Sequence, residues 1–196
     1  MSPIRIFVAS LAVAGVLTGT GAGAASAAAV SRFDDGSFET PAVGANTFGT
    51  VAAGGTIGPW KVTSGNVDHI GDGFWQAAEG GQSVDLNGTG AGTVAQTFTT
   101  VPGKRYTVTY SLAGNPAGGP TVKTGAVLVD GQNFRNFTFD ITGKSFGNMG
   151  YVTQEVTFVA RGTSTTLAFA STNNSAYGPV IDDVMVRDCT PCPSCG

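Results

Sequence analysis

The sequence carries little charge of either sign. Only 12% of its 196 residues are charged, and 10 Lys and Arg stand against 13 Asp and Glu, so the formal net charge is −3 and the pI is near 4.9. Proteins that bind nucleic acids through the phosphate backbone need a basic surface. This composition therefore excludes nucleic acid as the expected partner.

Long apolar runs are confined to the beginning of the chain. Arg5 is the lone charge before the apolar stretch 6–17, and the small residues Ala25-Ser26-Ala27 follow it. This order is typical of a secretory signal peptide, which we predict over residues 1–27, with a retained membrane anchor as the alternative. No later stretch approaches eighteen consecutive apolar residues, so we expect a secreted protein with no membrane association after signal cleavage.

The body of the chain lacks cysteine. Cys189, Cys192 and Cys195 all lie in the last eight residues, 189–196. The domain at 32–188 must therefore rely on a packed core, for which it is long enough. Three thiols cannot all pair within one chain, so we expect one local disulfide in this Cys/Pro-rich tail and a free thiol for a disulfide-linked partner. The alternative is an inert, flexible tail.

Leucine and glutamate are scarce after residue 27. Four Leu and three Glu stand against 18 Val and 23 Thr, which disfavours long helices and favours strands. Apolar and polar residues alternate over 106–112, 152–158 and 166–169, as expected for strands with one buried face. Turn signals recur about every ten residues, at 102–103, 115–120, 130–131, 142–143, 161–162 and 178–179. Together these patterns predict an all-β jelly-roll β-sandwich over 32–188.

Several longer motifs resemble a known family. They are Asp35-Gly36-Ser37-Phe38-Glu39, the tryptophan after Gly58-Pro59, and the segments 64–88, 95–108, LAGNPAGGP at 112–120, FTFDITGKS at 137–145 and YGPVIDDVMV at 177–186. They resemble the bacterial choice-of-anchor C family, which is similar to plant cell-wall proteins labelled domain of unknown function 642. The resemblance implies a secreted, galactose-binding-like jelly roll that associates with cell-wall or extracellular polysaccharides and is not an enzyme. The C-terminal CTPCPSCG contains no LPxTG-like motif, so attachment by a sortase is not expected.

The resemblance also implies a structural calcium. In carbohydrate-binding modules similar to this chain, a Glu of the first strand and an Asp of the last strand meet at the ion. The corresponding residues are Glu39 and either Asp182 or Asp183, because adjacent residues of a strand point to opposite faces. Calcium takes six to eight oxygen ligands, so backbone carbonyls would have to complete the shell. The alternative is that one aspartate caps a turn and the others are surface charges.

One loop-like run combines an aromatic residue with polar neighbours. Trp75 lies among glycines and polar residues at 71–76, where it is expected to stack on a sugar ring or, alternatively, to close the rim of the core. Asp68, His69 and Gln76 are the nearby polar candidates for a sugar site. The position of His69 is more typical of a hydrogen-bonded residue at a strand edge. Tyr177, beside a Gly-Pro pair, is a second loop aromatic.

No motif indicates catalysis. His69 has no partner serine in a GxSxG elbow, and the spacing of Asp68, Asp72, Glu79 and Asp85 does not require a glycosidase pair. We therefore expect a non-catalytic module that binds a polysaccharide. The alternatives are an adhesive or structural surface protein that binds another protein and, less favoured, a hydrolase.

Overall fold

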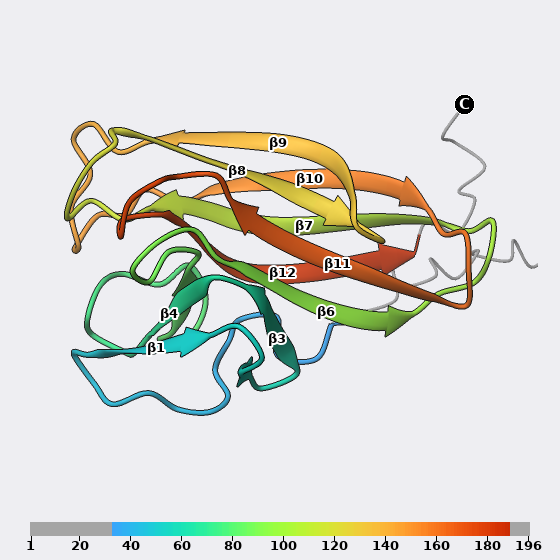
Figure 1. The fold of residues 1–196 in the computed structure, drawn as a ribbon, viewed down its shortest axis with the longest axis horizontal. Coiled ribbons are helices and arrows are strands. Elements are labelled where there is room, and N and C mark those ends of the chain that lie inside the picture. Colours follow the sequence, from blue (N-terminus) through green and yellow to red (C-terminus); the bar gives the residue numbers. More distant parts are fainter. Residues whose placement is uncertain (1–32, 189–196) are drawn as a thin grey trace, which may run out of the picture.

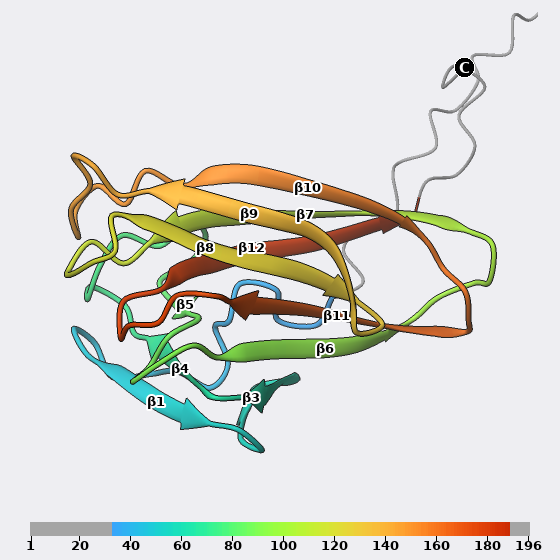
Figure 2. The same ribbon diagram turned by 45° about the horizontal axis from the view of Figure 1, so that its top comes forward.

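The computed structural model describes residues 33–188, which form a β-sandwich (Figure 1). Its two antiparallel sheets follow the orders β1-β4-β5-β12-β7-β10 and β2-β3-β6-β11-β8-β9, and Figure 2 shows the two layers. The strands are β1 (Phe48–Ala52), β2 (Thr56–Ile57), β3 (Trp60–Ser64), β4 (Asn66–Ile70), β5 (Ser83–Asp85), β6 (Thr93–Thr99), β7 (Arg105–Gly114), β8 (Val122–Val129), β9 (Gln132–Asp140), β10 (Val152–Val159), β11 (Ser164–Ser171) and β12 (Pro179–Asp188). The all-β jelly-roll prediction is confirmed.

The alternating segments predicted as strands lie in β7, β10 and β11. Glu39 was expected in a first strand, but residues 35–39 form a turn and irregular backbone, because Asp35 and Phe38 have positive φ angles that a strand does not allow. In β7, Tyr106, Val108 and Tyr110 are fully buried and alternate with partly exposed Thr107 and Thr109. The turn at residues 130–131 joins β8 to β9, and both of its residues have positive φ angles, 49° and 76°. Two-residue hairpin turns need this geometry, because it matches the twist of the flanking strands.

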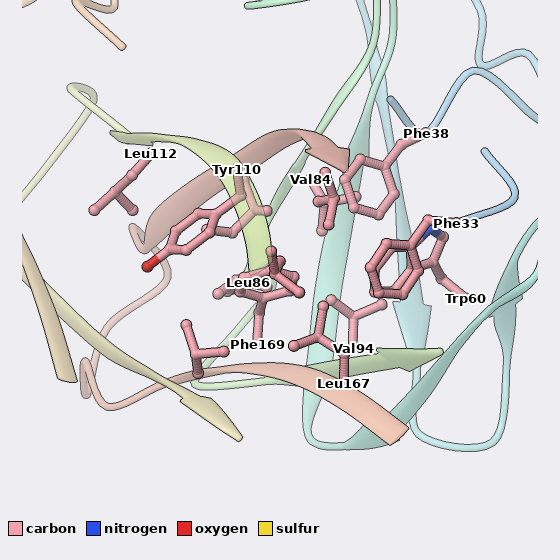
Figure 3. Close-up of a cluster of buried hydrophobic side chains, with 14 of the residues drawn as sticks. Phe33, Phe38, Trp60, Val84, Leu86, Val94, Tyr110, Leu112, Leu167 and Phe169 are labelled. Carbon is pink, nitrogen blue, oxygen red and sulfur yellow. The ribbon is translucent and has the colours of Figure 1, made fainter. Parts of the chain in front are cut away.

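The core lies between the two sheets (Figure 3). Trp60, which follows the Gly58-Pro59 pair, is fully buried, and its ring centroid lies 5.4 Å from that of Phe33 and 5.1 Å from that of Phe38. Its indole Nε1 donates to the Asp35 carbonyl oxygen at 2.9 Å, so its polar atom is also satisfied. These contacts fix the first described segment against the sandwich.

A β-bulge in β12 separates the two neighbouring aspartates near the end of the domain. The pairing of β12 with β7 shifts register between Asp182 and Met185, and Asp183 has a φ of 48°. Asp182 is fully buried, whereas Asp183 is partly exposed. Because the N–H of Val184 donates to the Gly36 carbonyl at 2.8 Å, the bulge also holds the first segment in place.

Three long connections meet at one end of the sandwich. The β7–β8, β9–β10 and β11–β12 connections all lie at its left end in Figure 1. Beside them, β4 buries Val67 and His69 against the core and turns Asp68 and Ile70 to the outer face of its sheet. Within residues 33–188, no helix has the length and apolar character needed to cross a membrane. The predicted signal peptide and the cysteine tail lie outside the described residues.

Candidate functional site

A cleft of about 350 Å³ opens where the outer ends of β1 and β4 meet the end loops. Its lining combines aromatic rings with small and polar side chains. The lining residues are Phe48, Thr50, Asp68, Ile70, Phe74, Trp75, Gly88, Thr89, Asn115, Ala117, Phe146, Ala176 and Tyr177. Strands or braced loops carry these side chains, so the fold builds the cleft without a ligand.

One wall of the cleft is a cluster of four rings, hereafter the aromatic wall: Phe48, Phe74, Trp75 and Phe146. Phe74 lies at its centre, with ring centroids 5.4 Å from each of the other three. Phe48 and Phe146 are 46% and 40% exposed, which is high for phenylalanine. Mutual packing therefore holds the wall in shape while two of its rings remain open to solvent.

Trp75 belongs to this wall, but most of it is buried. Only 5% of the residue is exposed, and its Nε1 donates to Ser83 Oγ at 2.8 Å. The residue thus lines the cleft and closes the core at the same time. The ring surfaces open to a ligand come mainly from Phe48, Phe146 and Tyr177, of which Tyr177 is 39% exposed.

The polar floor of the cleft comes from β1, β4 and the β5–β6 and β7–β8 connections. Asp68 Oδ1 accepts a hydrogen bond from Thr50 Oγ1 at 2.6 Å. Burial raises the pKa of the Asp68 carboxyl, and this hydrogen bond opposes the shift. Asn115 and Thr89 add an amide and a hydroxyl to the lining. The floor therefore offers both donors and acceptors to hydroxyl groups.

A second carboxylate, Asp85, lies fully buried beneath this floor. It pairs with Asp68 across β4 and β5, and it accepts hydrogen bonds from the Asn115 side chain at 2.8 Å and the Gly178 N–H at 3.1 Å. Burial raises its pKa to about 7, although hydrogen bonds from Asn115 and Asn87 act in the opposite direction. A Cβ on Gly178 would lie 2.5 Å from Asp85 Oδ1, so only glycine allows this approach. Asp85 thereby fixes two loops at the cleft.

Lys123 fixes the same two loops from the other sheet. Its side chain is buried, and Nζ donates to the carbonyl oxygens of Gly118 at 2.6 Å and Tyr177 at 2.9 Å. Burial lowers the pKa of this amine, and the negative charge of Asp85 opposes that shift. The Lys123 cation therefore ties the β7–β8 and β11–β12 connections together behind Tyr177.

The structure brings Asp68, Trp75 and Tyr177 together at the cleft, but it places His69 and Gln76 elsewhere. His69 is buried on the inner face of β4, where its Nε2 lies 2.7 Å from the Phe38 carbonyl oxygen. Burial lowers its pKa. Gln76 lies behind the aromatic wall, and its Oε1 accepts the N–H of Met149 at 3.1 Å.

Two of the three carboxylates considered as calcium ligands, Glu39 and Asp182, bind backbone amides. Glu39 Oε1 accepts two amides of the loop 78–82, at 3.0 and 2.9 Å, and Asp182 Oδ2 accepts two others, at 2.7 and 3.0 Å. Asp35 caps a turn by accepting the N–H of Glu39 at 2.7 Å. Over residues 33–188, no three His, Cys, Asp or Glu side chains gather as a metal site. The calcium site stays a prediction.

The protein is an all-β sandwich with an aromatic-walled cleft at one end. The family model described as "Protein of unknown function (DUF642)" matches residues 31–187. The chain belongs to this family. The match covers the described sandwich except its last residue, and all of the residues that line the cleft lie within it.

Similarities outside the family model are more distant. The chain is 31% identical over 171 residues to halomucin of Haloquadratum walsbyi, a match that covers 84% of this chain but only 2% of halomucin. A family 35 carbohydrate binding module from Clostridium thermocellum shares 17% identity with a TM-score of 0.49, over 72% of this chain and 99% of that one. TmCBM61 in complex with β-1,4-galactotriose shares 15% identity with a TM-score of 0.48, over 80% and 97%.

Several residues of the cleft were not among those predicted from the sequence. Phe48, Phe74, Phe146 and Asn115 come from four separate segments, and only the tertiary fold brings them together. A signal was present for Phe146, which lies between a serine and a glycine in a turn-rich segment. Trp75 was predicted from the same signal, an aromatic residue between glycines and polar residues in a loop.

Proposed function

We propose that this protein is a secreted, non-catalytic carbohydrate-binding module and that the cleft binds a cell-wall or other extracellular polysaccharide. The observation that supports this most is the composition of the cleft. Exposed rings of Phe48, Phe146 and Tyr177 stand beside the polar groups of Asp68 and Asn115. Sugar rings have an apolar face that stacks on aromatic rings and hydroxyl groups that need directed partners.

The charge of the cleft favours a neutral glycan. None of the residues that line it is Lys or Arg, and Asp68 is the sole carboxylate among them. Anionic sugars are recognised by paired cationic groups, above all by bidentate arginine. An Asp68 carboxylate can instead accept hydrogen bonds from sugar hydroxyls, while Thr50 holds it in position.

The acids of the cleft support a binding role over hydrolysis. Glycosidases need two carboxyl groups that both reach the scissile bond. Asp85, the neighbour of Asp68, is fully buried and already accepts three hydrogen bonds, from Asn87, Asn115 and Gly178. It therefore holds the cleft in shape and does not face a ligand.

A pull-down on insoluble neutral polysaccharides tests this function. The secreted domain is mixed with cellulose, mannan, xylan and β-1,4-galactan, and bound protein is quantified for wild type and Tyr177→Ala. Losing a stacking ring costs on the order of 1–3 kcal/mol in comparable aromatic contacts, so binding should weaken about fivefold or more. Tyr177→Ala keeps the backbone carbonyl that Lys123 binds, so the loop should keep its place.

The matched control is Phe134→Ala. Phe134 is 44% exposed, close to Tyr177, but it lies near the start of β9, away from the cleft. The proposal requires that the control bind like wild type. Equal binding by all three proteins would place the site elsewhere. If none of them binds any glycan, the adhesive-protein alternative replaces the proposal.

A further inference from the structure

A second depression lies on the other side of the aromatic wall. Its volume is about 320 Å³, and it is lined by Gly73, Phe74, Trp75, Gln76, Phe146 and Gly147. Phe74, Trp75 and Phe146 also line the main cleft. The same three rings therefore separate two adjoining hollows.

Phe146 stands between these hollows on a braced turn. The backbone groups of Ser145 and Asn148 exchange two hydrogen bonds, at 3.1 and 3.0 Å, which close the turn around it. The N–H of Gln76 donates to the Phe146 carbonyl at 2.8 Å. Met149, which directly follows the turn, is fully buried and anchors its end in the core. Although its ring is exposed, Phe146 is thus held in place from both sides.

Gln76 gives the second depression a directed polar group. Because a backbone N–H can only donate, the bond from Met149 identifies the acceptor atom of the amide as Oε1. The other end of the amide, Nε2, is therefore a donor, and no acceptor for it is recorded among residues 33–188. The side chain is exposed, so Nε2 is open to a hydroxyl group.

We infer that the two depressions are adjacent subsites for one glycan chain that crosses the edge of Phe146. A chain with one sugar in the main cleft would place a neighbouring sugar beside Phe146 and the Gln76 amide. The ligand class is then a stretch of at least two linked sugars of a neutral polysaccharide rather than a single sugar. This inference rests on the proposed function and specifies further that the protein recognises at least two neighbouring sugars.

Isothermal titration with oligosaccharides of increasing length tests the inference. The probes are cello-, manno-, xylo- and β-1,4-galacto-oligosaccharides of one to six units, titrated into the full secreted domain. Each bound sugar that stacks and forms hydrogen bonds adds contacts, so affinity for the matching series should rise about tenfold or more between one and four units.

The variant Gly147→Leu tests the second depression independently of the main cleft. Gly147 lines only the second depression, and a Cβ added there meets no atom within 4 Å, so the leucine fills open space without disturbing the core. The matched control is Gly162→Leu, in the β10–β11 turn at the opposite end of the sandwich, where an added Cβ makes only ordinary contacts of 3.5 and 3.9 Å. Thermal melting verifies that both variants are folded.

The expected result is that Gly147→Leu binds the monosaccharide like wild type but loses the increase with chain length, whereas Gly162→Leu keeps it. Wild-type affinity that is the same for one and six units would overturn the two-subsite inference and leave the proposed function standing. The same holds if Gly147→Leu keeps the full increase. If wild type binds no glycan of any length, the proposed function itself is wrong.

Discussion

At the scale of single residues, two buried aspartates hold loops at and near the end of the sandwich that carries the cleft. Asp85 accepts hydrogen bonds from the β7–β8 and β11–β12 connections, and Asp182 accepts two amides of the loop 78–82. Burial raises the pKa of each carboxyl from 3.8 to about 7. Each aspartate is buried because it accepts hydrogen bonds from loop groups inside the protein. In that position the charged carboxylate form is poorly solvated.

This arrangement predicts that the free energy of unfolding falls as pH rises from about 4 to about 7 and then levels off. In this range the native state retains protons on Asp85 and Asp182 that the unfolded state has released. Burial lowers the pKa of His69, so the contribution of His69 to the free energy of unfolding rises with pH up to its ordinary pKa of 6.5. The comparison of a variant with wild type isolates the aspartate contribution. Asp85→Asn, which does not titrate, should show a shallower decline in chemical denaturation from pH 4 to 8.

Asp140→Asn is the control for the pH dependence. Asp140 is exposed, and hydrogen bonds from Thr142 lower its pKa, so its own contribution to stability changes only below about pH 4. Its curve should run parallel to that of wild type between pH 4 and 7. An Asp85→Asn curve that also runs parallel would show that Asp85 is charged in the native state throughout this range.

At the scale of elements, the end of the sandwich that carries the cleft consists of loops tied to rigid strands. Lys123 reaches from β8 to the carbonyls of Gly118 and Tyr177, and Gln76 braces the turn that carries Phe146. Binding sites depend on such supporting contacts, because loops held in the bound geometry lose little entropy when a ligand arrives. The end loops should therefore keep the same shape with and without a glycan.

Lys123→Met tests this support. The substitution keeps a flexible apolar chain but leaves two inward-facing carbonyls without a donor, at a cost of about 1–3 kcal/mol each. We expect a lower melting temperature and a weaker affinity for any glycan that the cleft binds. The control is Lys61→Met, because Lys61 is exposed on β3. A melting temperature and an affinity unchanged by Lys123→Met would show that the loops are fixed by other contacts.

The elements were largely predictable from the sequence, whereas the site was predictable only in part. Local alternation and turn chemistry specify β7, β10 and β11, and the same period places Asp68 on the outer face of β4. Phe146 reaches Trp75 across about 70 residues of sequence through the pairing order of the sheets, which local patterns do not encode. Gln76 lies next to Trp75 in the sequence, yet the loop turns it to the other side of the aromatic wall.

At the scale of the whole molecule, the segment before β1 and the last strand, β12, are held to one loop through Glu39 and Asp182, respectively. A calcium ion shared by these residues would bind only the native state and would raise the melting temperature by mass action. Thermal melting in EDTA and then in millimolar calcium tests this, with Glu39→Ala as the variant. The calcium hypothesis predicts a rise for wild type that the variant lacks. Identical midpoints for wild type in both solutions would leave the two carboxylates with their amide-binding role alone.

The central claim is that the aromatic-walled cleft receives a neutral glycan, and the two tryptophans test it directly. Trp60 is fully buried in the core, whereas Trp75 lines the cleft, so only Trp75 should respond to a ligand. The measurement is a titration of intrinsic fluorescence with the glycan retained in the pull-down. Glycan binding at the cleft should cause a saturable change in wild type and Trp60→Phe that is absent in Trp75→Phe. A Trp75→Phe protein that binds with the full wild-type signal change, or a bound glycan that leaves Trp75 emission unaltered, would contradict it.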